Sequence, residues 1–184
     1  VSNYLNEKIG GILGLSVFQD MNVMFDLENQ LILAGSGLQP SSLNGTIQLH
    51  CTRVQNLPII SISMNQITHH FCLDTGSSVH MISQNFNNNS KVNLTQCFEE
   101  TILNDASENQ KTAVSVHTEL FGNIMTQHPK FIIQDFEEIN QQLEIELDGI
   151  IAGHLLNIRY IFLDFEKELC FIGFKFPSIS DATF

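Results

Sequence analysis

Asp74, Thr75 and Gly76 form the motif in this chain that could carry chemistry most directly. An Asp on a tight turn can project its carboxylate into a cleft, where it can act as a general acid or a general base. A hydroxyl beside it can brace the loop through hydrogen bonds, and a Gly lets backbone and substrate approach closely. Ser77 and Ser78 follow and extend the polar loop.

The segment before this motif has the pattern of a β-hairpin. Between residues 57 and 64, Ile60, Ile62 and Met64 fall on one face and alternate with serines, which is the period of a half-buried strand. A tight turn is predicted at 65–66, and the return strand at 67–73 runs directly into Asp74. The hairpin therefore places the carboxylate at a strand end.

A second hairpin is predicted farther along the chain. Its strands at 100–104 and 112–117 flank a turn-like segment made of Asp105, Ala106, Ser107, Glu108 and Asn109. Further strands are predicted at 119–125 and 130–134, whereas the polar segment 136–143 is predicted to be a loop or one helical turn. The sequence thus favours a mostly β fold.

An internal repeat is the most informative feature of the organisation. Residues 11–28 resemble residues 149–166, and both the glycines that open the copies and the aspartates Asp26 and Asp164 lie 138 residues apart. Each copy continues into an apolar strand. Residues 1–36 are therefore predicted to be the C-terminal tail of an upstream unit, or a segment that packs on the main domain.

The remaining boundaries follow from composition. Residues 37–45 are rich in Gly, Pro and Ser and are predicted to be a linker, 46–176 the main domain and 177–184 a tail. Because the chain starts at Val1 rather than Met, we expect a processed form or an excised fragment.

The hairpin and polar loop at 57–83 resemble those of retropepsin-like aspartic proteases, and residues 148–156 resemble their later Gly-apolar-apolar-Gly turn and helix. The resemblance spans about residues 45–175. It implies a closed, mostly antiparallel β-barrel with a short C-terminal helix, and the activity of an aspartic endopeptidase. It further implies that Asp74 is the catalytic carboxylate, Thr75 the bracing hydroxyl and Gly76 the residue beside the substrate.

The resemblance also implies two supporting segments. Residues 105–109 would form the tip of a substrate-covering flap, and the supporting turn would consist of Ile150, Ile151, Ala152 and Gly153. The chain departs from the family at both places, because Ala152 stands where a second Gly is usual and the flap has no glycines. An alternative function is therefore a non-catalytic binding or dimerisation module with the same fold.

The mechanism of this family needs two carboxylates that share a proton. This chain has a single Asp-Thr-Gly. We therefore expect the second carboxylate to come from another chain across a two-fold axis, in a homodimer, or from an upstream unit, in a pseudo-dimer. A peptide or protein is the expected substrate, and neither a cofactor nor a metal is expected.

Two other chemistries compete with this one. A metal site could use His69, His70, Cys72 and His80, but neighbouring residues of a strand point to opposite faces, so that only some of these can converge. Ser77 or Ser78 as a nucleophile is disfavoured, because the chain has no Gly-x-Ser-x-Gly elbow.

Composition bounds these hypotheses. The 184 residues suit one domain, and 43% apolar residues can build a core. A net charge of −12 argues against nucleic acid and anionic lipid as ligands, and no apolar run approaches the ~20 residues of a membrane-spanning helix, so that membrane insertion is not expected. The four cysteines lie far apart, which favours buried free thiols.

Overall fold

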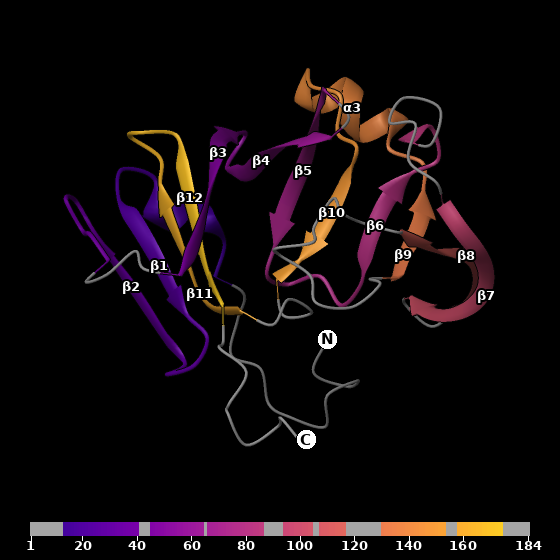
Figure 1. The fold of residues 1–184 in the computed structure, drawn as a ribbon, viewed down its shortest axis with the longest axis horizontal. Helices are drawn as coiled ribbons and strands as arrows, with labels where there is room; N and C mark the ends of the chain where they lie inside the picture. Colours follow the sequence, from indigo (N-terminus) through magenta and orange to yellow (C-terminus); the bar gives the residue numbers. More distant parts are fainter. Residues whose placement is uncertain are drawn as a thin grey trace.

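The computed structural model describes residues 13–40, 45–64, 66–86, 94–104, 107–116, 130–153 and 158–174. These residues form twelve strands, one short 3-10 helix and one α-helix (Figure 1). The helices are η1 (Leu15–Phe18) and α3 (Glu137–Leu143); the strands are β1 (Asn22–Asp26), β2 (Leu31–Gly35), β3 (Thr46–Val54), β4 (Leu57–Met64), β5 (Ile67–Asp74), β6 (His80–Ser83), β7 (Leu94–Asn104), β8 (Ser107–Val116), β9 (Lys130–Gln134), β10 (Gly149–Ala152), β11 (Ile158–Asp164) and β12 (Leu169–Phe174).

All twelve strands belong to one sheet, in the order β2-β1-β11-β12-β3-β4-β5-β10-β6-β9-β8-β7. Most neighbours are antiparallel, and the pairs β5–β10 and β6–β9 are parallel. The mostly β fold is confirmed. The closed barrel is not, because β2 and β7 end the strand order and lie on opposite sides of the molecule (Figure 1).

The hairpin before Asp74 forms as predicted. Strands β4 and β5 pair with Ile60 opposite Phe71 and Ile62 opposite His69, and all four side chains are buried. The opposite face is buried too, because Ile59 and Cys72 belong to a second apolar cluster. This double burial holds the strand that carries Asp74 rigidly in the middle of the sheet.

Helix α3 covers the second cluster. Its Leu143 packs there, and just before the helix Asp135 Oδ1 accepts a hydrogen bond from the backbone N–H of Glu137 at 2.9 Å. The negative charges of Glu137 and Glu138 in the first turn interact favourably with the positive end of the helix dipole. This segment, predicted to be a loop or one turn, is therefore a seven-residue helix.

The second hairpin is longer and tighter than predicted. Asn104 pairs with Ser107, and Leu103 with Glu108, so that Ser107–Asn109 belong to β8 rather than to a turn. Asp105 and Ala106 lie outside the described residues, as does the strand predicted at 119–125. Strand β9 forms where a strand was predicted.

Strand β10 corrects the interpretation of Ile150–Gly153 as a turn. Residues 149–152 form a strand inserted between β5 and β6, parallel to the first and antiparallel to the second. The side chains of Ile151 and Ala152 alternate between the two faces of the sheet, and both are fully buried. Residues 154–157, which fall in the region where the short C-terminal helix was expected, lie outside the described residues.

Gly149 allows this insertion, because a Cβ there would lie 2.3 Å from the carbonyl oxygen of Met81 and 3.0 Å from the ring of Phe71. We expect Gly149→Ala to lower the free energy of unfolding by about 1–3 kcal/mol, since β6 would have to move. Gly35→Ala is the matched control, because a Cβ there meets nothing within 4 Å. Urea denaturation of both variants checks this; equal midpoints would contradict it.

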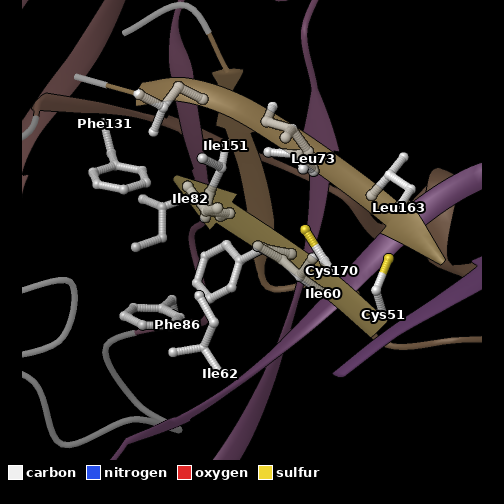
Figure 2. Packing of buried hydrophobic residues seen from close by; sticks show 14 residues of the cluster. Cys51, Ile60, Ile62, Leu73, Ile82, Phe86, Phe131, Ile151, Leu163 and Cys170 are labelled. Atoms are coloured by element: carbon white, nitrogen blue, oxygen red, sulfur yellow. The ribbon is translucent and has the colours of Figure 1, made fainter. Parts of the chain in front are cut away.

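The main core takes side chains from β3, β4, β5, β6, β9, β10, β11 and β12, among them Ile60, Leu73, Ile82, Ile151 and Leu163 (Figure 2). Cys51, Cys72 and Cys170 are buried free thiols. Burial raises the pKa of Cys51 and of Cys72 to about 12 and that of Cys170 well above its ordinary value. These thiols therefore stay protonated and unreactive at neutral pH.

The described part of the N-terminal segment, residues 13–36, packs on the main domain, residues 46–176. The Arg53 guanidinium donates hydrogen bonds to the carbonyl oxygens of Phe18 and Gln19, and Glu28 forms an ion pair with Arg159. Strand β1 pairs antiparallel with β11. Among the described residues, no helix has the length and apolar character needed to cross a lipid bilayer.

The hairpins β1–β2 and β11–β12 have the same internal register at an offset of 138 residues. Asp26 pairs with Leu31, as Asp164 pairs with Leu169. Their turns match as well: Asp26 Oδ1 accepts from the N–H of Asn29, Asp164 Oδ1 accepts from that of Lys167, and the next residues, Gln30 and Glu168, have φ near +57° and +56°. The two segments therefore fold alike at this level of detail.

Candidate active site

Asp74 is the last residue of β5 and lies opposite Ala152 at the end of β10. Its side chain is half-buried, and its Oδ1 accepts a hydrogen bond from the backbone N–H of Gly76 at 2.8 Å. Thr75 and Gly76 are exposed. The loop therefore holds the carboxylate in one orientation at the rim of the sheet.

Ser77 closes this loop from within. Its Oγ donates to the carbonyl oxygen of Val79 at 2.7 Å and accepts from the Val79 N–H at 3.4 Å, while Ser78 is exposed. Strand β10 separates β5 from β6, so that residues 75–79 must pass over its end. Ser77 thus stabilises the crossing, a role that the sequence did not assign to it.

The backbone beneath the loop approaches it closely at Gly153. A Cβ on Gly153 would lie 3.1 Å from Thr75 Cγ2 and 3.5 Å from Ile161 Cδ1, so the Thr75 side chain would have to shift slightly to admit it. The side chain of Ala152, the residue before Gly153, is fully buried.

His80 is a supporting residue that sequence reasoning considered only as a metal ligand. It is buried, its Nδ1 accepts a hydrogen bond from the N–H of Ala152 at 3.1 Å, and its ring stacks on Phe131 with centroids 5.0 Å apart. The imidazole therefore fixes β10 beside Asp74. Nothing in the local pattern of a His that opens a short strand signals this inward orientation.

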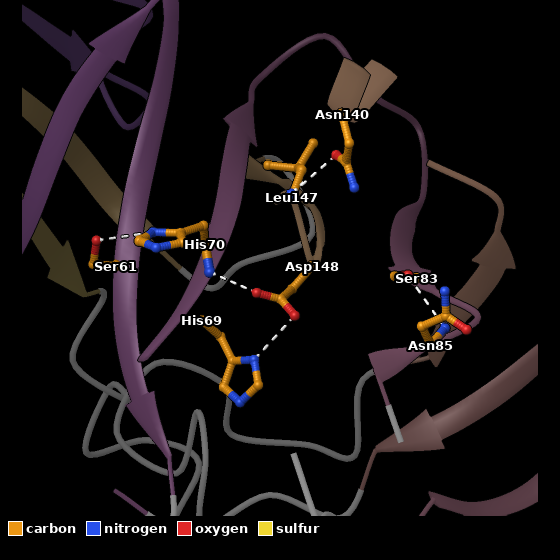
Figure 3. Close-up of polar contacts among 8 residues, drawn as sticks. All are labelled: Ser61, His69, His70, Ser83, Asn85, Asn140, Leu147 and Asp148. Atoms are coloured by element: carbon orange, nitrogen blue, oxygen red, sulfur yellow. Dashed lines mark hydrogen bonds and ion pairs between the residues drawn. The ribbon is translucent and has the colours of Figure 1, made fainter. Parts of the chain in front are cut away.

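A second support lies at the other end of β10, where Asp148 joins β5 and β6 (Figure 3). Asp148 Oδ2 accepts from the backbone N–H of His70 at 2.9 Å, and its Oδ1 lies 3.0 Å from Nδ1 of His69. The Asp148 carbonyl accepts from the N–H of Ser83. Both His69 and Asp148 are buried, so this contact holds β10 in its slot away from water.

A cavity of about 330 Å³ lies beside Asp74. Its lining is largely apolar and comes from both the main domain and the N-terminal segment: Asp74, Thr75, Gly76, Leu57, Pro58, Leu73, Ile161 and Leu163 from the former, and Leu13, Gly14, Leu15, Phe18, Phe25 and Ile32 from the latter. A carboxylate at the rim of an apolar cavity is an arrangement suited to binding a chain with apolar side chains.

The three histidines of the alternative metal site each contact a different partner. His69 contacts Asp148, His70 Nδ1 lies 3.3 Å from Ser61 Oγ, and His80 accepts from Ala152. Within the described ranges, no group of three or more His, Cys, Asp or Glu side chains lies close enough to hold a metal ion. Residues 105 and 106 of the expected flap lie outside those ranges.

Three comparisons with known proteins were made. No protein-family model matches the chain, and no curated protein matches it. Among solved structures, the chain is similar to a retropepsin-like aspartic protease from Rickettsia conorii, with 16% sequence identity and a TM-score of 0.43. The match covers 71% of this chain and 91% of that structure.

Proposed function

We propose that this protein is an aspartic endopeptidase in which Asp74 supplies one of two catalytic carboxylates. The observation that carries the proposal is the position of Asp74, on a braced loop at the end of a buried strand and at the rim of a largely apolar cavity. The sequence resemblance of residues 57–83 to retropepsin-like proteases supports the same reading.

In this proposal, a second retropepsin-like unit supplies the second carboxylate. The N-terminal segment is the C-terminal tail of that unit. At the offset of 138, Leu13–Leu15 correspond to Ile151–Gly153, and the latter lie beside Asp74 and Thr75. The Asp-Thr-Gly of the second unit would then lie beside Leu13–Leu15. Because these residues line the same cavity as Asp74, both loops would border one site.

The chemistry follows from two adjacent carboxylates. One, ionised, accepts a proton from a water molecule that attacks the scissile carbonyl carbon, while the other, protonated, donates its proton to the carbonyl oxygen. The tetrahedral intermediate then breaks at the C–N bond: the carboxyl group that took up the proton of the water donates it to the leaving amine, and the other carboxylate takes back a proton from a hydroxyl of the intermediate. The exposed Thr75 hydroxyl is available to brace the facing loop of the second unit.

Ala152, where the chain departs from the family, is fully buried and pairs with Asp74 across β10 and β5. A binding module of the same fold is the outcome that the following experiment would reveal.

We expect the assembled two-unit protein to cleave peptides with a bell-shaped pH dependence that peaks at acid to mildly acid pH. The negative charge of the first carboxylate raises the pKa of the second, so the pair holds one shared proton over an intermediate pH range. The rate falls above this range, where the shared proton is lost, and below it, where both groups are protonated. Pepstatin-like mimics of the transition state should compete with substrate. A diverse peptide library incubated across this pH range checks this, and an intact assembly that cleaves nothing would favour the binding module.

A further inference from the structure

The outer strand of the N-terminal hairpin is an apolar sheet edge. The exposed fractions of Ile32 and Leu33 in β2 are 51% and 43%, while the corresponding residues of β12, Cys170 and Phe171, are 0% and 8% exposed. The two hairpins share one register, so this contrast does not come from the hairpins themselves. Part of it comes from β3, which pairs with β12.

The pairing of the two hairpins defines a local two-fold relation. In β1–β11, Met24 pairs with Phe162, which is its own counterpart at the offset of 138, and Val23 and Phe25 pair with the counterparts of each other, Leu163 and Ile161. A rotation about this point exchanges β1 with β11 and β2 with β12. The same rotation carries β3 to a position along the outer edge of β2, which no described strand occupies.

We propose that the edge of β2 is a docking site for the first strand of a second retropepsin-like unit, in the register that β3 adopts on β12. Ile32 would then face the counterpart of Leu49, and Ala34 the counterpart of Ile47. This inference rests on the proposed two-unit function and names the surface that joins the units.

An intact second copy of this chain does not fit the site. Its β3 already pairs with β12 on one side and with β4 on the other, and so has no free edge. The occupant is instead the unit that ends in the hairpin β1–β2. The first strand of that unit has no other last hairpin to pair with, so its outer side is open to β2.

The hydrogen-bonding phase of the edge follows from β12. The N–H of Cys51 donates to the carbonyl of Glu168, so this pair is a hydrogen-bonded pair, and bonded pairs alternate along an antiparallel ladder. In β12 the alternation reaches Cys170 and Ile172. Ile32 and Ala34 of β2 are the counterparts of Cys170 and Ile172 at the offset of 138. Their backbone N–H groups therefore point to the outer edge of β2.

A peptide with the β3 sequence, residues 46–54, with Ser in place of Cys51 and blocked ends, tests the site on the full chain. We expect saturable binding that slows hydrogen exchange at Ile32 and Ala34 by about tenfold or more, and no effect of a scrambled peptide. Ala34→Pro should abolish the protection, because it removes an edge donor, while Ala34→Ser should keep it.

Two results would overturn the proposal. One is unchanged exchange at Ile32 and Ala34 at the highest soluble peptide concentration. The other is protection without peptide that rises with protein concentration, which would identify a second copy as the occupant. Neither readout involves cleavage, so a failed docking test and a failed protease assay are distinguishable.

Discussion

Asp74→Asn is expected to lower peptide cleavage by the two-unit protein by a factor between about 10² and 10⁴, the usual contribution of a general acid or base. Asn keeps the shape of the side chain and can still accept the hydrogen bond from Gly76, but it cannot take up the proton of the attacking water. Steady-state kinetics at the pH optimum measures the loss, which should fall on kcat.

The matched control is Asp20→Asn, which makes the same chemical change on the surface and should leave kcat and the urea midpoint unchanged. Asp74→Asn should also keep its urea midpoint, because Asp74 contributes little to the core. Cleavage by Asp74→Asn at the wild-type rate would remove Asp74 from the mechanism. Loss of activity together with unfolding would instead assign Asp74 a structural role.

Asp148→Ala is expected to destabilise the fold by about 1–3 kcal/mol for each buried donor that it leaves without an acceptor. The substitution leaves the imidazole of His69 and the backbone N–H of His70 without their acceptor inside the protein. Nε2 of His69 has no hydrogen-bond partner among the described residues, so the substitution would leave both ring nitrogens without one there.

Urea denaturation of Asp148→Ala beside Asp20→Ala separates this local effect from a general loss of negative charge. Asp148→Asn should recover part of the stability, since an amide oxygen can still accept from one of the two donors. An unchanged midpoint for Asp148→Ala would show that the contact with His69 does not hold β10 in place.

The sequence predicted the elements whose residues follow a regular alternation or spacing along the chain. The alternation of Ile60 and Ile62 predicted β4, and the constant spacing of Asp26 and Asp164 predicted two hairpins with matching turns. Strand β10 was interpreted as a turn, because four residues that start with a glycine have no visible period. Its strand conformation depends on Met81 and Phe71, which lie far away in sequence.

In the candidate site, too, the sequence predicted what depends on neighbouring residues and missed what depends on distant ones. Asp74 was placed correctly at a strand end, because the motif is local. The supports from His80, Ser77 and Asp148 were missed, because each depends on a contact across the inserted strand or within the crossing loop. No pattern along the chain could show that residues 80 and 152 would meet.

The most direct test of the account is a crystal structure of the longest natural polypeptide that contains this chain. We predict a second Asp-Thr-Gly loop beside Leu13–Leu15, with its carboxylate within about 2.6–3.2 Å of Asp74, the distance at which two groups share a proton. A structure in which Asp74 lies far from any second such loop, in an assembly that retains activity, would contradict the account.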